Sequence, residues 1–118
     1  MKKKILCLLI LILVLSSCTS TQQVSMYNWA GYEDISYKFL KNRTEEETEN
    51  LISCYKDVIN EANGTRNVPP PGICADYGFL LLQQDKINEG INYLNLEKSY
   101  YPESSNLIDK IIETYEEK

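Results

Sequence analysis

The sequence predicts an all-α protein of about five helices, arranged as helical hairpins after a signal peptide. Apolar residues recur at helical spacing in five stretches of the chain from residue 32 onward. Prolines, glycines and asparagine-containing pairs separate these stretches and are typical helix boundaries. No stretch alternates between apolar and polar residues with a period of two, so no β-strand is predicted.

The first two helices are expected over residues 32–41 and 44–62. Asn42-Arg43 ends the first of them. The second begins with a capping-box pattern formed by Thr44 and Glu47, and its three N-terminal glutamates lie at the positive end of the helix dipole. Asn63-Gly64 is a typical signal for the C-terminal end of a helix, so the second helix should end there.

Three further helices are expected over residues 72–84, over residues 87–100, and after Ser104. Three consecutive prolines precede the first of these, and Pro71 can serve as its first helical residue, where a missing N–H costs nothing. Gln84-Asp85-Lys86 is expected to turn the chain, and Pro102 to stop the helix before it. Either Ser104 or Ser105 should cap the last helix.

Residues 71–104 span 34 residues, which is the period of the tetratricopeptide repeat. In that register Gly78 and Gly90 fall where two helices cross closely, Leu94 where a large apolar side chain is needed, and Pro102 where the helix stops. Glu97 departs from the pattern, because a small residue is usual there. The segment resembles a tetratricopeptide-like hairpin, and a generic helical hairpin is the alternative.

Two hairpins and a terminal helix are fewer than the three repeats that a self-sufficient solenoid usually needs. We therefore expect the missing buried surface to come from a protein partner or from self-association.

The N-terminus has the pattern of a bacterial lipoprotein precursor. Three lysines precede an apolar run over residues 5–15, which is too short to span a bilayer and fits the apolar core of a signal peptide. The run ends in Leu15-Ser16-Ser17-Cys18, which resembles the lipobox whose cysteine receives a diacylglyceryl group. An ordinary signal peptide with a chance cysteine is the alternative interpretation.

This pattern predicts three parts: a signal peptide over residues 1–17, a lipidated Cys18 with a flexible tether over 18–26, and a helical-repeat-like domain over 27–118. Covalent lipid would hold the protein at the cell envelope. Because Thr19 follows the cysteine, in place of an aspartate, the outer membrane of a double-membraned bacterium is the expected location.

The charge composition excludes several classes of function. The chain has 12 Lys and Arg, 17 Asp and Glu, and no histidine, which excludes catalytic triads and metal sites that need imidazole. Residues 1–17 include three lysines and no acid, so their removal leaves a net charge of −8. Such an acidic chain is not expected to bind nucleic acid. No paired carboxylates suggest acid–base catalysis, so we expect neither an enzyme nor a metal or other cofactor.

Aromatic residues near the start of the domain are the candidate interaction surface: Tyr27, Trp29 and Tyr37. Their rings combine large apolar area with a polar tip, which suits contact with a peptide or glycan. Packing at the N-terminal end of the fold is the alternative, and Tyr37 lies away from the apolar stripe of its helix. A ligand-binding protein would instead require a deep pocket among Asp76, Tyr77 and the aromatic residues.

Cys54 and Cys74 lie on consecutive predicted helices. A disulfide is one interpretation in an oxidising compartment, and two ordinary small core residues is the other. Without CxxC spacing or a histidine partner, redox or cysteine-protease chemistry is not expected.

Three segments resemble an uncharacterised family of small bacterial lipoproteins known only as a domain of unknown function: residues 27–33, residues 70–78 and residues 97–104. The resemblance implies a tetratricopeptide-like lipoprotein, often encoded beside a curli-secretion-pore-like lipoprotein, and implies no enzymatic activity. Together these observations predict an envelope protein that serves as a protein–protein interaction or assembly module. A small periplasmic ligand- or peptide-binding protein and a structural spacer are the alternatives.

Overall fold

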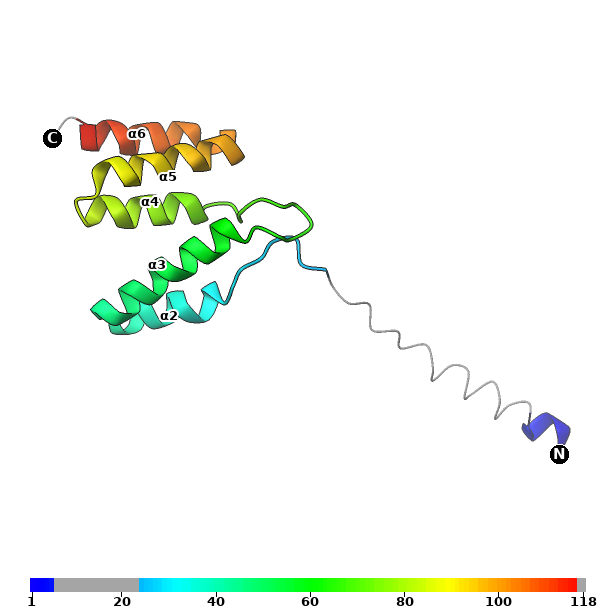
Figure 1. The fold of residues 1–118 in the computed structure, drawn as a ribbon. Coiled ribbons are helices and arrows are strands. Elements are labelled where there is room, and N and C mark those ends of the chain that lie inside the picture. Colours follow the sequence, from blue (N-terminus) through cyan, green and yellow to red (C-terminus); the bar gives the residue numbers. More distant parts are fainter. Residues whose placement is uncertain (6–23, 117–118) are drawn as a thin grey trace.

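The computed structural model describes residues 1–5 and 24–116. From residue 32 onward, the described chain forms five α-helices and one short 3₁₀ helix (Figure 1): α2 (Tyr32–Asn42), α3 (Glu45–Asn60), α4 (Ile73–Gln83), α5 (Ile87–Tyr100), η1 (Pro102–Ser104) and α6 (Ser105–Glu116). Neither described segment contains a β-strand. The predicted all-α fold is confirmed, and the five helices lie in the five stretches that the periodicity of the apolar residues predicts.

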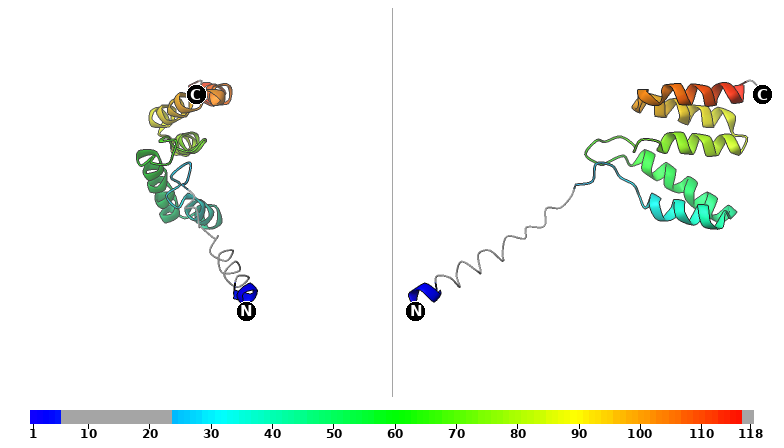
Figure 2. Two further views of the ribbon diagram at one scale, coloured as in Figure 1. Left: turned by 90° about the vertical axis from the view of Figure 1, so that its right-hand side faces the viewer. Right: turned by 180° about the vertical axis from the view of Figure 1, so that it is seen from behind.

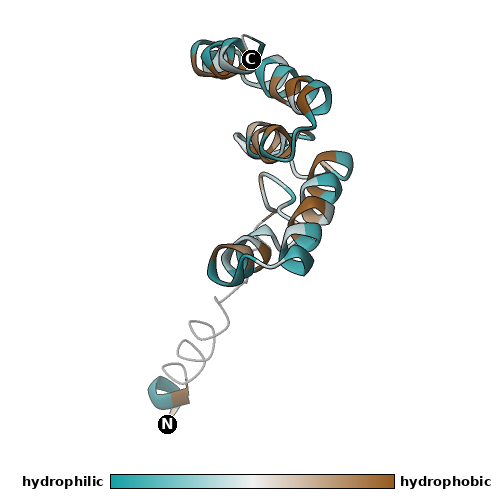
Figure 3. Cartoon of the chain, turned by 90° about the vertical axis from the view of Figure 1, so that its left-hand side faces the viewer, coloured by the Kyte–Doolittle hydropathy of each residue, from teal (hydrophilic) through white to brown (hydrophobic). Residues whose placement is uncertain are grey.

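The helices pack one upon the next in a zigzag stack, with α2 at one end and α6 at the other (Figure 2). Helix α4 lies in the middle of the stack and contributes six buried residues, whereas α2 contributes none. Figure 3 shows hydrophobic colouring over most of α4, and mixed colouring over the helices at the two ends. The core therefore follows the stack and is centred on α4.

Helices α2 and α3 form a hairpin whose turn is closed by local hydrogen bonds. Arg43 adopts a left-handed conformation (φ 50°), and its N–H donates to the carbonyl of Phe39 at 2.9 Å. The Thr44 hydroxyl accepts from the N–H of Glu47 at 3.2 Å, as the capping pattern predicts. The Glu47 carboxylate does not complete the box. It accepts a bond from the side-chain amide of Asn42 instead.

Helices α4 and α5 cross at two glycines that face each other. A Cβ built on Gly78 would lie 2.8 Å from the Gly90 carbonyl oxygen, and a Cβ on Gly90 would lie 2.8 Å from that of Gly78. Hydrogen in place of a side chain thus allows the two backbones to touch. The close crossing expected at this pair is present in the structure.

The predicted ends of α3 and α4 need correction. Helix α3 ends at Asn60, two residues before its predicted end, and Gly64 lies in the following loop, where it is packed against the backbone of Met26. Helix α4 begins at Ile73, so Pro71 is not helical. Gly72 is the residue directly before α4, and its φ of 91° is left-handed and therefore not helical. Because Gly72 turns the chain into the helix, Pro71 lies outside it.

The expected serine cap of the last helix is absent. The hydroxyls of Ser104 and Ser105 donate backward, to the carbonyls of Tyr101 and Pro102, both at 2.7 Å. They close the 3₁₀ turn η1, which runs directly into α6. Pro102 does stop α5, since it begins this turn.

The segment before α2 is fixed on the loop between α3 and α4, and we call residues 24–31 the docked segment. The N–H groups of Thr65 and Arg66 donate to the carbonyls of Ser25 and Met26, both at 3.2 Å. A Cβ on Gly64 would lie 2.3 Å from the Met26 carbonyl oxygen, so only glycine permits this approach. Residues 24–26, predicted as tether, are therefore held on the domain. The rest of the predicted tether lies outside the described residues.

Candidate functional site

Six aromatic side chains form a continuous row through the stack: Tyr27, Trp29, Tyr32, Tyr55, Tyr77 and Tyr93. Neighbouring ring centroids are 4.4 to 6.4 Å apart, within the range of favourable aromatic contacts. Tyr55 and Tyr77 are buried, while Trp29 is 43% exposed. The row is therefore core in its middle and surface at its N-terminal end.

Two of the three predicted surface aromatics lie together, and the third lies elsewhere. Tyr27 and Trp29 meet edge to face with centroids 6.4 Å apart, both on the docked segment. Successive left-handed residues, Ala30 and Gly31, turn the chain there, and the Tyr32 N–H donates to the Trp29 carbonyl at 2.8 Å. Tyr37 lies on α2 and takes no part in the row. The candidate surface consists of two separate places.

Tyr37 and Leu40 are the exposed apolar side chains of α2, at 63% and 61% exposure. They are three residues apart, so they lie on the same side of the helix. Ile35 and Phe39 pack against the neighbouring core on the other side. Helix α2 is the end of the stack, and a terminal helix of a solenoid normally has a polar outer face. This outer face of α2 is instead partly apolar.

A tyrosine hydroxyl links α2 to α4 through a carboxylate. The Tyr32 hydroxyl donates to Asp76 Oδ2 at 3.4 Å. Burial raises the pKa of the Asp76 carboxyl, and the hydrogen bond from Tyr32 opposes the shift. Tyr77, the next residue, stacks between the rings of Tyr55 and Tyr93 at centroid distances of 5.4 and 4.4 Å. Tyr77 is 1% exposed, so its ring is enclosed by protein and does not present the ligand surface that a pocket would need.

Glu97 is the buried carboxylate of the domain, at 2% exposure. Its Oε1 accepts from the N–H of Gly72 at 2.7 Å, so the side chain reaches from α5 to the N-terminus of α4. Its Oε2 is buried and has no hydrogen-bond partner within the described ranges. A carboxylate at a helix N-terminus satisfies free N–H groups and complements the dipole. The residue that departs from the repeat pattern therefore serves as a cap from a different helix.

Acidification should stabilise the domain through Glu97. Burial raises the pKa of its carboxyl, and this effect outweighs the opposing influence of the backbone N–H groups near the start of α4, that of Gly72 first. The folded state therefore binds a proton at a pH where the unfolded state does not, and stability rises as the pH falls through the raised pKa of Glu97 toward the ordinary carboxyl value of 4.5. In Glu97→Gln the neutral amide keeps an acceptor for Gly72, and the rise should be smaller.

Thermal melting by circular dichroism at several pH values tests this effect. Asp76 also has a raised pKa, so the variant should retain part of the pH dependence. Parallel curves for the wild type and Glu97→Gln would contradict the assignment to Glu97.

The two cysteines of the helical region are free thiols, and the disulfide considered from the sequence is not formed. Cys54 Sγ donates to the carbonyl of Ala30 at 3.7 Å. Cys74 is fully buried, and burial raises the pKa of its thiol to about 12. Each thiol has packing of its own, which matches the interpretation as small core residues.

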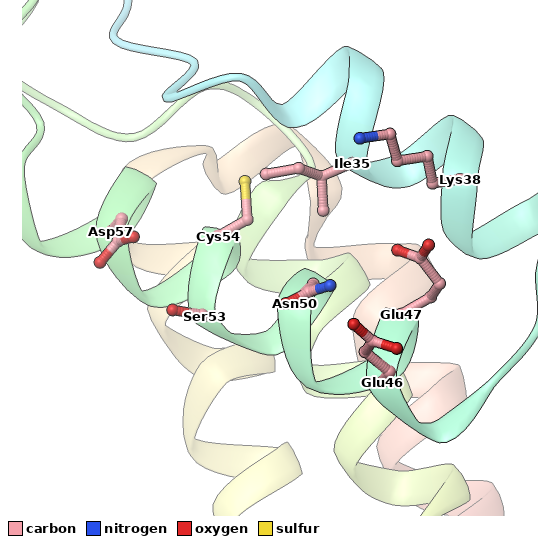
Figure 4. A pocket seen from close by; sticks show the side chains of 8 residues that line it. All are labelled: Ile35, Lys38, Glu46, Glu47, Asn50, Ser53, Cys54 and Asp57. Atoms are coloured by element: carbon pink, nitrogen blue, oxygen red, sulfur yellow. The ribbon is translucent and has the colours of Figure 1, made fainter.

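A polar hollow of about 390 Å³ lies between α2 and α3 (Figure 4), lined by Ile35, Lys38, Glu46, Glu47, Asn50, Ser53, Cys54 and Asp57. Its carboxylates come from α3, and Lys38 reaches over it from α2. No cluster of histidine, cysteine or acidic residues in residues 1–5 and 24–116 has the arrangement of a metal site. A second hollow of about 430 Å³ is lined by Trp29, Gly31, Tyr32 and Glu33.

The predicted lipidation site, Cys18, and most of the predicted signal peptide lie outside the described residues. Among the helices that are described, none has the length and apolar character required to cross a membrane.

A comparison with protein families finds a match that covers most of the helical region. The model of DUF4810, a domain of unknown function, matches residues 26–111. This chain belongs to the DUF4810 family. The DUF4810 match begins in the docked segment and ends within α6, so it includes the aromatic row, Glu97 and the outer face of α2. No curated protein and no solved structure matches the chain.

Proposed function

We propose that this DUF4810 protein is a lipid-anchored lipoprotein of the cell envelope that binds another protein and helps to assemble a larger complex. The outer face of α2 carries the proposal. Tyr37 and Leu40 are more than half exposed on the terminal helix of an open stack, where a polar surface would be expected. Large apolar side chains on such a surface favour contact with a protein partner.

The lipid anchor rests on the sequence of the N-terminus. The apolar run and Leu15-Ser16-Ser17-Cys18 fit the lipobox, and three residues of positive charge precede them. Two or three acyl chains on Cys18 would hold the acidic domain at a membrane that its own charge does not attract. We place the protein at the outer membrane because Thr19 follows the cysteine.

We also infer that α4 and α5 form a tetratricopeptide-like repeat. The mutual contact of Gly78 and Gly90 supports this, since the repeat needs small residues where its two helices cross. With α2 and α3 as a second, divergent hairpin, the chain has too few repeats to bury a full solenoid core. A partner that packs on α2 would extend the stack.

Crosslinking in intact envelopes tests the proposal with the full lipidated chain. Purification of tagged protein should recover one partner in stoichiometric amount. Tyr37→Ser combined with Leu40→Ser should lower that recovery about tenfold or more, because exposed aromatic and aliphatic residues at an interface centre contribute most of the affinity. Leu107→Ser is the matched control, since Leu107 is equally exposed but lies on α6.

Four outcomes decide between these possibilities. Loss of recovery in the α2 variant alone supports the proposal. Recovery of untagged copies of the same chain would show that the partner is a second copy of this protein. Equal recovery from the wild type and the α2 variant would overturn the role of α2. Absence of any stoichiometric partner from the wild type would overturn the assembly function. Because both side chains are exposed, the variant should melt within a few degrees of the wild type.

A further inference from the structure

The docked segment exposes three apolar side chains on the side of the domain that carries the α3–α4 loop. We call Val24, Met26 and Trp29 the anchor-end patch. Their exposed fractions are 76%, 54% and 43%. The backbone beneath them is fixed, because Ser25 and Met26 accept hydrogen bonds from the α3–α4 loop and Asn28 donates to the Glu61 carbonyl at 2.9 Å. The patch is thus an apolar surface on a firmly held segment.

The chain length between Cys18 and this patch is short. Six residue steps separate Cys18 from Val24, and an extended chain covers at most about 3.5 Å per step, or roughly 20 Å in all. Any lipid on Cys18 therefore keeps the patch within about this distance of the membrane surface. The turns between α2 and α3 and between α4 and α5 lie on the opposite side of the domain, at the other ends of these helices (Figure 1).

The charge distribution favours the same end. Residues 19–32 contain no charged side chain, and the α3–α4 loop over residues 62–72 contains only the basic Arg66. The 17 acidic residues lie elsewhere in the chain. Glu33, beside Trp29, and Glu61, beside Asn28, are acids that border this surface, but neither the docked segment nor the α3–α4 loop carries one. Anionic lipid repels an acidic protein, so these acid-free segments approach a bilayer with the least electrostatic cost.

The side chains of the patch suit the boundary between lipid and water. Tryptophan concentrates at this boundary because its ring is apolar and its N–H remains hydrated. Valine and methionine add apolar area without charge. No side chain within residues 24–29 would need to lose an ionic hydration shell on contact.

We propose that the anchor-end patch seats on the membrane that carries the Cys18 lipid, with Trp29 at the depth of the headgroups. This inference rests on the lipid anchor of the proposed function. It gives the domain a fixed orientation, in which the α3–α4 loop faces the bilayer and the turns after α2 and α4 point away from it. The partner-binding residues Tyr37 and Leu40 of α2 then remain accessible.

Trp29 is the chain's one tryptophan, so its fluorescence reports on the patch without labelling. The full lipidated protein is incorporated into phosphatidylcholine vesicles, with and without bromine on the acyl chains near the headgroup. We expect a blue-shifted emission, and quenching by at least half in the brominated vesicles. Protein that floats with the vesicles but shows unquenched Trp29 emission would overturn the orientation.

Two variants separate seating from the effect of the tether. Val24→Ser combined with Met26→Ser should reduce the quenching at least twofold, because the patch loses its aliphatic area while the lipid is unchanged. Leu40→Ser, at a similarly exposed position on α2, should leave the quenching unaltered. Equal quenching in all three proteins would overturn the role of the patch.

Failure of the anchor has a different signature. Protein without acyl mass that does not float with vesicles would overturn both the anchor and the seating. Failure of the seating alone leaves the acyl mass and the flotation intact and removes only the quenching. Partner recovery in the crosslinking experiment depends on α2 and reports separately on the assembly function.

Discussion

Replacing Gly78 with valine should destabilise the helical stack strongly. The new Cβ would meet the Gly90 carbonyl oxygen at 2.8 Å and Leu94 at 3.0 to 3.1 Å. Two of these contacts are with backbone atoms, so α4 and α5 must separate. Overpacking of this kind costs about 2–3 kcal/mol, which corresponds to roughly 10–20 °C in melting temperature for a domain of this size.

Thermal melting with matched variants checks this expectation. Gln83→Val places the same β-branched side chain on an exposed position of α4 and should change stability by about 0.5 kcal/mol or less. Gly90→Ala should have an intermediate effect, since part of its clash is with the flexible side chain of Leu82. A Gly78→Val protein that melts with the wild type would contradict the close crossing of the two helices.

Replacing Cys18 with serine should abolish the acylated mature form of the protein. A hydroxyl is a much weaker nucleophile than a thiolate, so the diacylglyceryl transfer that precedes cleavage should not occur. We expect mass spectrometry of the wild type to show a chain that begins at Cys18 and carries acyl groups. In the variant this species should be absent.

Cys7→Ser is the matched control, because Cys7 also lies in the N-terminal region but lacks the preceding Leu-Ser-Ser. It should leave the acylated species unchanged. An acylated chain in the Cys18→Ser protein, or an unmodified Cys18 in the wild type, would refute the anchor and with it the proposed location.

The sequence was sufficient to predict most of the helical fold. Apolar spacing located all five helices, and the capping pattern located the start of α3 at Thr44. These signals are local, since they depend on residues within one or two turns of each other. The glycines at 78 and 90 could be recognised because the repeat period gave their relation in space before the structure did.

The remaining features depend on residues distant in the sequence. The Asn63-Gly64 pair predicts a helix end, but Gly64 accommodates the backbone of Met26, 38 residues earlier. In the sequence Glu97 is only a departure from the repeat pattern, because its hydrogen bond with Gly72 joins residues 25 positions apart. The aromatic row likewise required the packing of four helices, although its individual residues were visible in the sequence.

Cys54 and Cys74, the two buried cysteines of the helical region, bear on how the domain folds. Cys54 and Cys74 are both free thiols, so the packing of the helices around them does not depend on a disulfide between the two. A sulfur that remains protonated and shut away from solvent is also inert toward electrophiles. Chemical reactivity at Cys74 is thus a property of the unfolded chain, and it is lost when the helices pack around this side chain.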